Sequence, residues 1–236
     1  NWGCIPTKAL LKSAQVFEYL KNATDYGIIV DSVNKDFSSV ISRSRKVADT
    51  MSKGVKFLMK KNKITVFNGF GKLFENNTVK VTDENKKEII LHSKNIIIAT
   101  GARSKELPNI KQDGDFIIGY REAMTLKKQP KKITIIGSGA IGIEFAFFYN
   151  SMGTDVTVIE YLDRIIPNED KEISKELRKI LTKKGVNFLT STKVLNTKIE
   201  NGTVNLEIES KDGSKELLDS EIVLSAIGIK SNIEDI

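Results

Sequence analysis

The chain has 236 residues, of which 40% are hydrophobic and 28% charged, and its formal net charge is +7. This length suits one large domain or two ordinary ones, and the apolar content allows sizeable buried cores. No apolar run approaches the roughly 18 residues that a membrane span requires, and the first residues lack the layout of a signal peptide. A membrane span is therefore excluded, and a soluble protein is expected.

The positive charge is spread along the chain, because 37 Lys and Arg residues alternate with 30 Asp and Glu residues. The densest basic group lies on a predicted helix whose other face is apolar, which favours a solvated helix face over a nucleic-acid site: Lys53, Lys56, Lys60, Lys61 and Lys63. A nucleic-acid binder stays a poor alternative, which would show salt-sensitive binding. The single cysteine, Cys4, excludes a disulfide within the chain. His92 is expected in a loop or on the surface, and no Cys/His cluster suggests a metal site.

Two helices are expected early in the chain. Pro6 suits the first turn of a helix, where its missing N–H costs nothing, and apolar residues then recur at helical spacing through Phe17. A helix is therefore predicted over residues 6–21. A longer helix is predicted over residues 36–62, with an apolar stripe formed by Val40, Val47, Met51, Val55 and Leu58.

Short strands are expected next. Residues 64–67 are predicted to form a strand, and residues 78–81 and 88–91 are predicted to form a small meander with a turn at 83–85. Residues 94–99 contain three consecutive isoleucines, which is typical of a buried strand.

From Lys131 the pattern changes to alternating strand and helix, the signature of a parallel sheet. Gly153 and Gly185 suit the ends of the two helices. The expected elements are strand 133–136, helix 141–152, strand 156–160, a helix over about 170–184, and strand 221–226.

A glycine-rich turn joins the first of these strands to the first helix: Gly137-Ser138-Gly139-Ala140-Ile141-Gly142 fits G-x-G-x-x-G. In such a turn, the first glycine allows the tight bend, the second lets the backbone approach a pyrophosphate, and the third lets helix and strand pack closely. N–H groups at the helix N-terminus receive the phosphate charge. The alternative is a glycine-rich turn that holds no ligand.

Glu160 ends the next predicted strand, 23 positions after Gly137, close to the roughly 20 that this motif expects. Its carboxylate is expected to accept hydrogen bonds from the adenosine ribose and to repel a 2′-phosphate, which favours NAD over NADP. Arg164 would favour a 2′-phosphate, but Glu160 occupies the discriminating position.

Cys4 lies just before the helix predicted at residues 6–21. The helix N-terminus stabilises a thiolate, and the positive charge of Lys8 adds to this effect. A thiolate is a nucleophile and an electron donor, whereas a buried cysteine is commonly inert. From these residues alone, a redox thiol and a structural thiol are equally open.

Several segments together resemble the pyridine nucleotide–disulfide oxidoreductases, and within them the dihydrolipoamide dehydrogenases. The first ten residues, NWGCIPTKAL, resemble the family's redox-site segment. Further matching segments, in the family's order, extend the resemblance over nearly the whole chain: Ala99–Ala102, Tyr120–Ala123, Gly137–Glu144, Glu160–Pro167 and Ala226–Gly228.

The resemblance implies an α/β protein with two Rossmann-like three-layer domains: part of an FAD-binding domain in residues 1–115 and an NAD-binding domain in residues 116–236. It implies that Cys4 is the second cysteine of the family's C-x-x-x-x-C pair, the one that lies against the flavin. The first cysteine would fall two residues before Asn1. The chain is therefore expected to be an internal fragment that lacks the FAD phosphate site and the dimerisation domain with its catalytic His–Glu pair.

The resemblance also implies roles for single residues. Lys8 would approach the flavin and pair with Glu144 beside the nicotinamide, which makes Cys4, Lys8 and Glu144 the candidate catalytic set. The FAD contacts would come from Lys8, Gly71, Thr100 and Gly101. The NAD contacts would come from Gly137, Ser138, Gly139, Ala140, Ile141, Gly142, Glu160, Val194, Ala226, Ile227 and Gly228.

In the intact enzyme, the resemblance implies that dihydrolipoamide reduces the cysteine pair through a mixed disulfide. Electrons would then pass from the Cys4 thiolate to FAD and, as hydride, to NAD⁺. The expected partners are dihydrolipoamide or the lipoyl domain of a 2-oxoacid dehydrogenase complex, and a second copy in a homodimer, with no nucleic acid or membrane. A cytoplasmic location suits this chemistry. The alternatives are a sibling NAD(P)H-dependent disulfide, peroxide or mercuric reductase, and a non-catalytic NAD-binding fragment.

Overall fold

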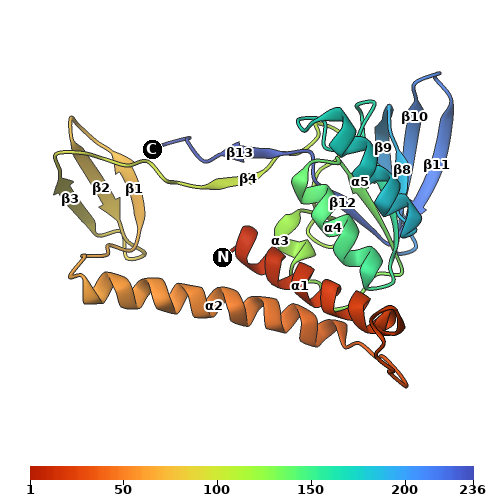
Figure 1. Cartoon of the computed structure of the whole chain (residues 1–236). Helices are drawn as coiled ribbons and strands as arrows, with labels where there is room; N and C mark the ends of the chain where they lie inside the picture. The colour runs from red at the N-terminus through yellow and green to blue at the C-terminus, as the bar shows by residue number, and fades with distance from the viewer. The chain divides into compact units, whose positions relative to one another are not determined.

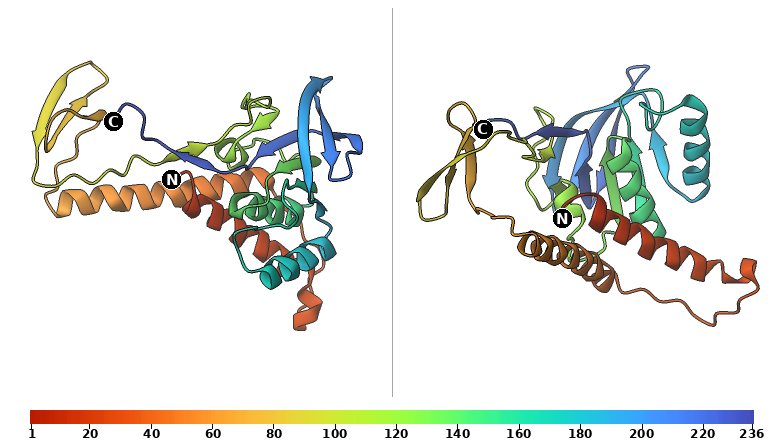
Figure 2. Two further views of the ribbon diagram at one scale, coloured as in Figure 1. Left: turned by 90° about the horizontal axis from the view of Figure 1, so that it is seen from above. Right: turned by 60° about the vertical axis from the view of Figure 1, so that its left-hand side comes forward.

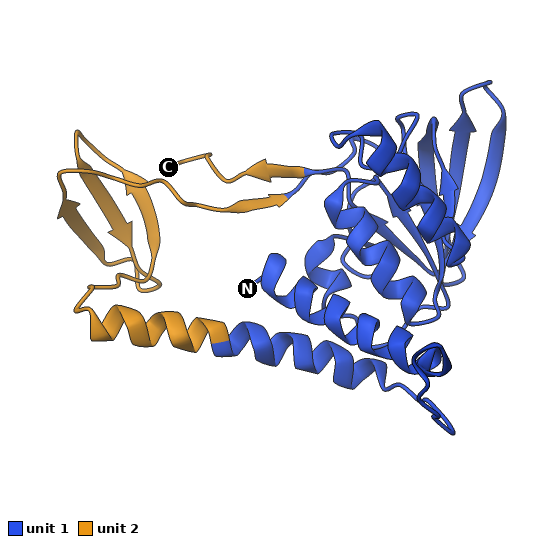
Figure 3. Ribbon diagram, viewed as in Figure 1, with its two compact units in different colours: residues 1–50, 104–228 blue, residues 51–103, 229–236 orange.

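The computed structural model describes all residues, 1–236, and they fall into two compact units. The first unit consists of residues 1–50 and 104–228, and the second of residues 51–103 and 229–236 (Figure 3). These units do not coincide with the cofactor domains expected at 1–115 and 116–236, because residues 1–50 pack with the sheet that follows residue 104. The expected domains are defined by the cofactors they would hold, so that division stays a prediction.

A five-stranded parallel sheet forms the centre of the first unit (Figure 1). Its order is β5-β12-β6-β7-β8, so β6 has β7 on one side and β12 on the other. β-Branched residues dominate the central strands, as expected for strands that are buried on both faces. The predicted parallel α/β sheet is confirmed. Its strands are β5 (Ile117–Ile118), β6 (Lys132–Ile136), β7 (Asp155–Ile159), β8 (Asn187–Leu189) and β12 (Ile222–Ser225).

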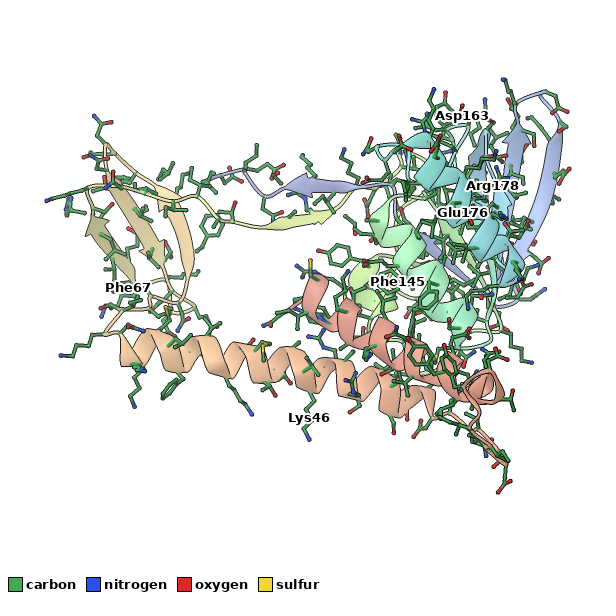
Figure 4. The ribbon with its side chains drawn as sticks, in the orientation of Figure 1. Lys46, Phe67, Phe145, Asp163, Glu176 and Arg178 are labelled. Carbon is green, nitrogen blue, oxygen red and sulfur yellow. The ribbon has the colours of Figure 1, made fainter.

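Helices cover one face of this sheet. Ile133 and Ile135 of β6 point to that face and share a buried core with Phe145, labelled in Figure 4, and with residues of the first two helices. Helix α1 packs against α4, as both views in Figure 2 show. The helices are α1 (Cys4–Lys21), the 3₁₀ helix η1 (Ala23–Tyr26), α2 (Phe37–Lys61), α3 (Tyr120–Ala123), α4 (Ala140–Ser151) and α5 (Lys171–Lys183).

An antiparallel meander covers the opposite face of the sheet. It consists of β9 (Thr192–Glu200), β10 (Thr203–Ser210) and β11 (Lys215–Ser220). Alternate residues of β10 are buried and share a second core with Ile136 of β6. Helices, parallel sheet and meander therefore form three layers.

The predicted helices are confirmed, with two corrections. Helix α1 begins at Cys4, so the thiol lies in the first helical turn rather than before it. In α2 the predicted apolar stripe is wrong: Val40 and Val47 are partly buried, and the stripe residues beyond them are exposed. The helix face that packs in the first unit is displaced by one position from the predicted stripe. Contact with the neighbouring helices selects which face of α2 is buried. Lys46, on the outer side of the helix, points away from α1 (Figure 4). The buried residues of α2 are Phe37, Ile41, Ser44 and Ala48.

The second unit contains an antiparallel sheet of β1 (Phe70–Leu73), β2 (Thr78–Thr82) and β3 (Glu88–His92). It also contains, except for Ser104, the pair formed by β4 (Ala102–Ser104) and β13 (Ile229–Ser231). The predicted meander and its turn are confirmed, and His92 is exposed at the end of β3.

The strands predicted at residues 64–67 and 94–99 do not form in the second unit. Ile97 is 91% exposed and Ile98 is 54% exposed, rather than buried. A strand requires a neighbouring strand for its N–H and C=O groups, and none pairs with either segment.

Across the chain, no helix combines the length and the apolar character that crossing a membrane demands.

Candidate functional site

A cavity of about 610 Å³ opens at the carboxyl ends of β6, β7 and β12. The sheet order reverses between β6 and β12, and ligands of open α/β sheets bind in the crevice at such a switch point. The cavity is lined by Leu107, Ile136, Gly137, Ser138, Gly139, Ile159, Glu160, Tyr161, Leu162, Pro167, Asn168, Thr192, Lys193, Val194, Ala226, Ile227 and Gly228.

The three glycines of the turn meet different steric demands. Gly137 has a φ of +99°, and a Cβ there would lie 2.6 Å from the carbonyl oxygen of Ala226. A Cβ on Gly142 would collide with the carbonyl oxygen of Gly137, whereas a Cβ on Gly139 would meet no atom within 4 Å. Gly137 and Gly142 thus allow the turn to pack closely against the neighbouring backbone. Gly139 leaves open space beside the backbone. This is a surface that a diphosphate fits.

Glu160 is buried and accepts three hydrogen bonds from the chain. Its Oε2 accepts from the Ser138 N–H at 2.8 Å and from the Ser138 hydroxyl at 2.6 Å, and its Oε1 accepts from the Leu162 N–H at 2.9 Å. The carboxylate that was predicted at the end of the second strand therefore lies in the cavity wall, next to the glycine-rich turn. Sequence reasoning missed its bond to Ser138, because G-x-G-x-x-G leaves that position unspecified.

The rest of the cavity wall comes from segments far apart in the chain. Val194, on β9, and the Ala226–Gly228 segment were predicted to line the site, and the structure places them around the same cavity. Tyr161 and Leu162 were missed, although residues that follow a parallel strand are expected at the sheet's carboxyl edge. Leu107 had no signal in the sequence.

The basic residues near the turn do not line this cavity, apart from Lys193. Arg164 donates to the carbonyl oxygen of Pro167 at 2.8 Å, and it lies in the loop that also contains Asp163 (Figure 4). Lys132 forms an ion pair with Asp219. Lys193 pairs with Glu209 at 2.8 Å, and the hydrogen bond that its ammonium group donates to this carboxylate raises the pKa of Lys193.

The last three members of the glycine-rich turn, Ala140, Ile141 and Gly142, lie in the first turn of α4 and do not line the cavity. Their backbone N–H groups start the helix, so their predicted part in phosphate binding concerns the helix N-terminus rather than the side chains.

The predicted redox residues lie in a separate part of the first unit. Cys4 is exposed, and one turn later Lys8 forms an ion pair with Glu144 of α4. Cys4 and Lys8 border a second hollow of about 340 Å³, together with Arg43. The hydroxyl of Thr7 donates to the carbonyl oxygen of Gly3 at 2.8 Å. The first two turns of α1 thus present a thiol and a cation to one hollow.

Three further candidate residues belong to the second unit. Gly71 lies in β1 opposite Val81 of β2. The Thr100 hydroxyl donates to the carbonyl oxygen of Asn232, whose N–H donates to the carbonyl oxygen of Gly101 at 3.0 Å. The flavin contacts expected of Gly71, Thr100 and Gly101 stay predictions.

The whole chain, residues 1–236, matches the family described as pyridine nucleotide-disulphide oxidoreductase. The dihydrolipoyl dehydrogenase of Zymomonas mobilis is 43% identical over 238 residues, which cover 100% of this chain and 51% of that protein. The dihydrolipoyl dehydrogenase of Bacillus subtilis is 40% identical and is covered to 51%, and that of Acholeplasma laidlawii is 37% identical and is covered to 68%. The chain spans about half the length of the first two relatives.

Solved structures show the same fold. LpdA from Mycobacterium tuberculosis superimposes with a TM-score of 0.87 at 22% identity, over 98% of this chain and 50% of that one. The HOCl-induced flavoprotein disulfide reductase RclA from Escherichia coli superimposes with a TM-score of 0.79 at 24% identity, over 100% of this chain and 49% of that one. With the match over its full length, the chain belongs to the pyridine nucleotide–disulphide oxidoreductase family of flavoproteins.

Proposed function

We propose that this chain carries the NAD site and the flavin-side redox cysteine of a dihydrolipoamide dehydrogenase. The observation that carries the proposal is the buried Glu160 carboxylate beside the glycine-rich turn, in a cavity at the switch point of the sheet. The relatives named dihydrolipoyl dehydrogenase, which match at about 40% identity, support the choice of substrate. In the overall reaction dihydrolipoamide loses two electrons and two protons, and NAD⁺ gains a hydride while one proton is released.

The cavity suits a dinucleotide along its length. N–H groups of the glycine-rich turn and of the α4 N-terminus would bind the pyrophosphate. The carboxylate of Glu160 would accept a hydrogen bond from the adenosine ribose, and its negative charge would repel a 2′-phosphate. Leu107 and Val194 give the cavity an apolar wall, against which the flat adenine base would pack. Ala226, Ile227 and Gly228 would border the nicotinamide half.

The N-terminal part of α1 would act in the exchange of thiols with the substrate. Cys4 is exposed, as a residue that exchanges thiols must be. Lys8 holds a positive charge one turn away, and Glu144 fixes its ammonium group. FAD, when bound, would carry two electrons between the thiol and the nicotinamide. We assign residues 1–115 to its domain and residues 116–236 to the NAD domain. A lipoyl domain and a second copy of the chain are the proposed partners, in the cytoplasm.

The test is a titration of the purified chain with NADH and NADPH, followed by nicotinamide fluorescence. We expect a preference for NADH that Glu160→Ala reduces by about tenfold, the effect of losing one hydrogen bond to a charged group. Glu200→Ala serves as the control, because this acid ends β9 and does not line the cavity. If the wild-type chain binds neither nucleotide, the proposed NAD site is wrong.

A further inference from the structure

The position between the first two glycines of the turn is occupied by Ser138, whose side chain is fully buried against Glu160. We propose that Ser138 is a positioning residue that fixes the Glu160 carboxylate and thereby sets the preference for NADH over NADPH. This inference rests on the proposed NAD site. It concerns a position that the glycine-rich motif leaves free, and therefore a feature of this chain rather than of the motif.

The three donors around Glu160 match an ionised carboxylate, which is an acceptor only. Both donors of Ser138, its N–H and its hydroxyl, point to Oε2, at 2.8 and 2.6 Å. Each carboxylate oxygen offers about two acceptor positions, so Ser138 fills Oε2. The Leu162 N–H takes one position of Oε1.

One acceptor position of Oε1 is left for a ligand. The carboxylate is therefore arranged to accept one ribose hydroxyl with one oxygen while the other oxygen is fixed to the turn. The same bonds keep the negative charge where a 2′-phosphate would approach. A site that hydrogen-bonds one ribose hydroxyl discriminates best between NADH and NADPH when the accepting carboxylate is held in one orientation.

Substitution by alanine separates the two donors of Ser138. Ser138→Ala removes the hydroxyl but keeps the backbone N–H, so Oε2 loses one of its two bonds and the carboxylate gains freedom to rotate. The ribose hydroxyl would then bind less tightly, and the 2′-phosphate would meet a charge that is able to move away. We expect NADH affinity to fall about three- to tenfold, less than the full effect of one hydrogen bond to a charged group, because Ser138 acts through Glu160, while NADPH affinity stays the same or rises.

The experiment uses the full chain and measures NADH and NADPH affinities for the wild type, Ser138→Ala, Glu160→Ala and the double variant. If Ser138 acts through Glu160, its substitution changes the NADH/NADPH ratio in the wild type but changes it less than about twofold when Glu160 is already alanine. The matched control is Ser214→Ala, which removes a hydroxyl that donates to Asp212 at 2.7 Å in the turn after β10. This control is expected to leave both affinities unchanged.

Binding of reduced nicotinamide mononucleotide, which lacks the adenosine ribose, separates positioning from damage to the turn. A positioning role leaves this affinity unchanged in Ser138→Ala. An unchanged NADH/NADPH ratio in Ser138→Ala, an equal loss for all three nucleotides, or the same effect with and without Glu160 would each overturn the inference. In those cases the wild type still prefers NADH, whereas failure of the proposed NAD site is recognised by a wild type that binds no nucleotide.

Discussion

Lys8 on α1 forms an ion pair with Glu144 on α4, and the two residues are 136 positions apart in the chain. Helix α1 carries Cys4 in its first turn, and α4 begins at the glycine-rich turn. The pair therefore connects the helix that presents the thiol to the helix that borders the nucleotide site. Because the two side chains are 60% and 32% exposed, the pair is expected to contribute little to stability, as partly exposed ion pairs do.

A double-mutant cycle with Lys8→Met and Glu144→Gln tests this. We expect a coupling free energy of about 0.5 kcal/mol in urea unfolding, and a smaller value at 1 M salt because the charges are screened. The same cycle on the Lys132–Asp219 pair, which joins β6 and β11, is the control, because the side chains of the two ion pairs are exposed to a similar extent. Strict additivity of the two substitutions at low salt would show that the pair contributes nothing.

Gly142 and Gly139 are predicted to respond in opposite ways to alanine. A Cβ on Gly142 collides with the backbone of Gly137, so Gly142→Ala should destabilise the fold by about 2 kcal/mol or more, although alanine is the better helix former. Gly139→Ala meets no atom within 4 Å and should leave stability within about 0.5 kcal/mol.

Nucleotide binding should distinguish these two variants further. The Gly139 Cβ would occupy the space beside the backbone that the phosphates require, so NADH affinity is expected to fall by at least about tenfold in a folded protein. Thermal unfolding and NADH titration of both variants provide the measurements. A stable Gly139→Ala variant with wild-type affinity would show that the diphosphate lies elsewhere.

Tyr149 of α4 is fully buried, and its hydroxyl donates to the carbonyl oxygen of Ala123 at 2.6 Å. Burial raises the pKa of Tyr149 far above its usual range, so the phenol stays neutral. Tyr149→Phe leaves that carbonyl without this donor and should cost about 1–2 kcal/mol in the free energy of unfolding. Tyr19→Phe, at an exposed position on α1, is the control and should change it little. Equal midpoints in urea for Tyr149→Phe and the wild type would contradict the prediction.

Asp36 precedes α2 and accepts hydrogen bonds from the Ser39 hydroxyl and N–H and from the Ser38 hydroxyl. These bonds, that of the Ser39 hydroxyl above all, lower the pKa of Asp36 from 3.8 to about 2. A carboxyl whose pKa is lower in the folded state stabilises the fold above its unfolded pKa, and this stabilisation is lost as the pH falls toward the folded pKa. The window of loss is therefore between about pH 4 and pH 2.

The corresponding measurement is the thermal midpoint of the wild type and of Asp36→Asn from pH 6 to pH 2. The wild type is expected to be the more stable at pH 6, and the difference should shrink below about pH 4. A difference that stays constant over this range would show that the ionised carboxylate is not the group that stabilises the start of α2.

Local sequence determined the elements whose signals act within a few residues. Pro6 suits the first turn of α1, Asp170 accepts from the Glu172 and Ile173 N–H groups at the start of α5, and Gly153 and Gly185 adopt positive φ at helix ends. The spacing of Gly137, Gly139, Gly142 and Glu160 likewise determined where the cavity lies, because strand, turn and helix follow one another directly. For this reason the parallel sheet could be predicted, and so could the part of the cavity wall that the glycine-rich turn and Glu160 form.

Only the tertiary structure decided the features that depend on a distant partner. Residues 94–99 have the composition of a buried strand but form none, since no strand pairs with them. The buried face of α2 was selected by the helices packed against it. Leu107 lines the cavity, and Ser138 meets Glu160, through folding of separate segments. Propensity and spacing act along the chain, whereas pairing, packing and side-chain hydrogen bonds act across it, and these contacts are absent from any local pattern.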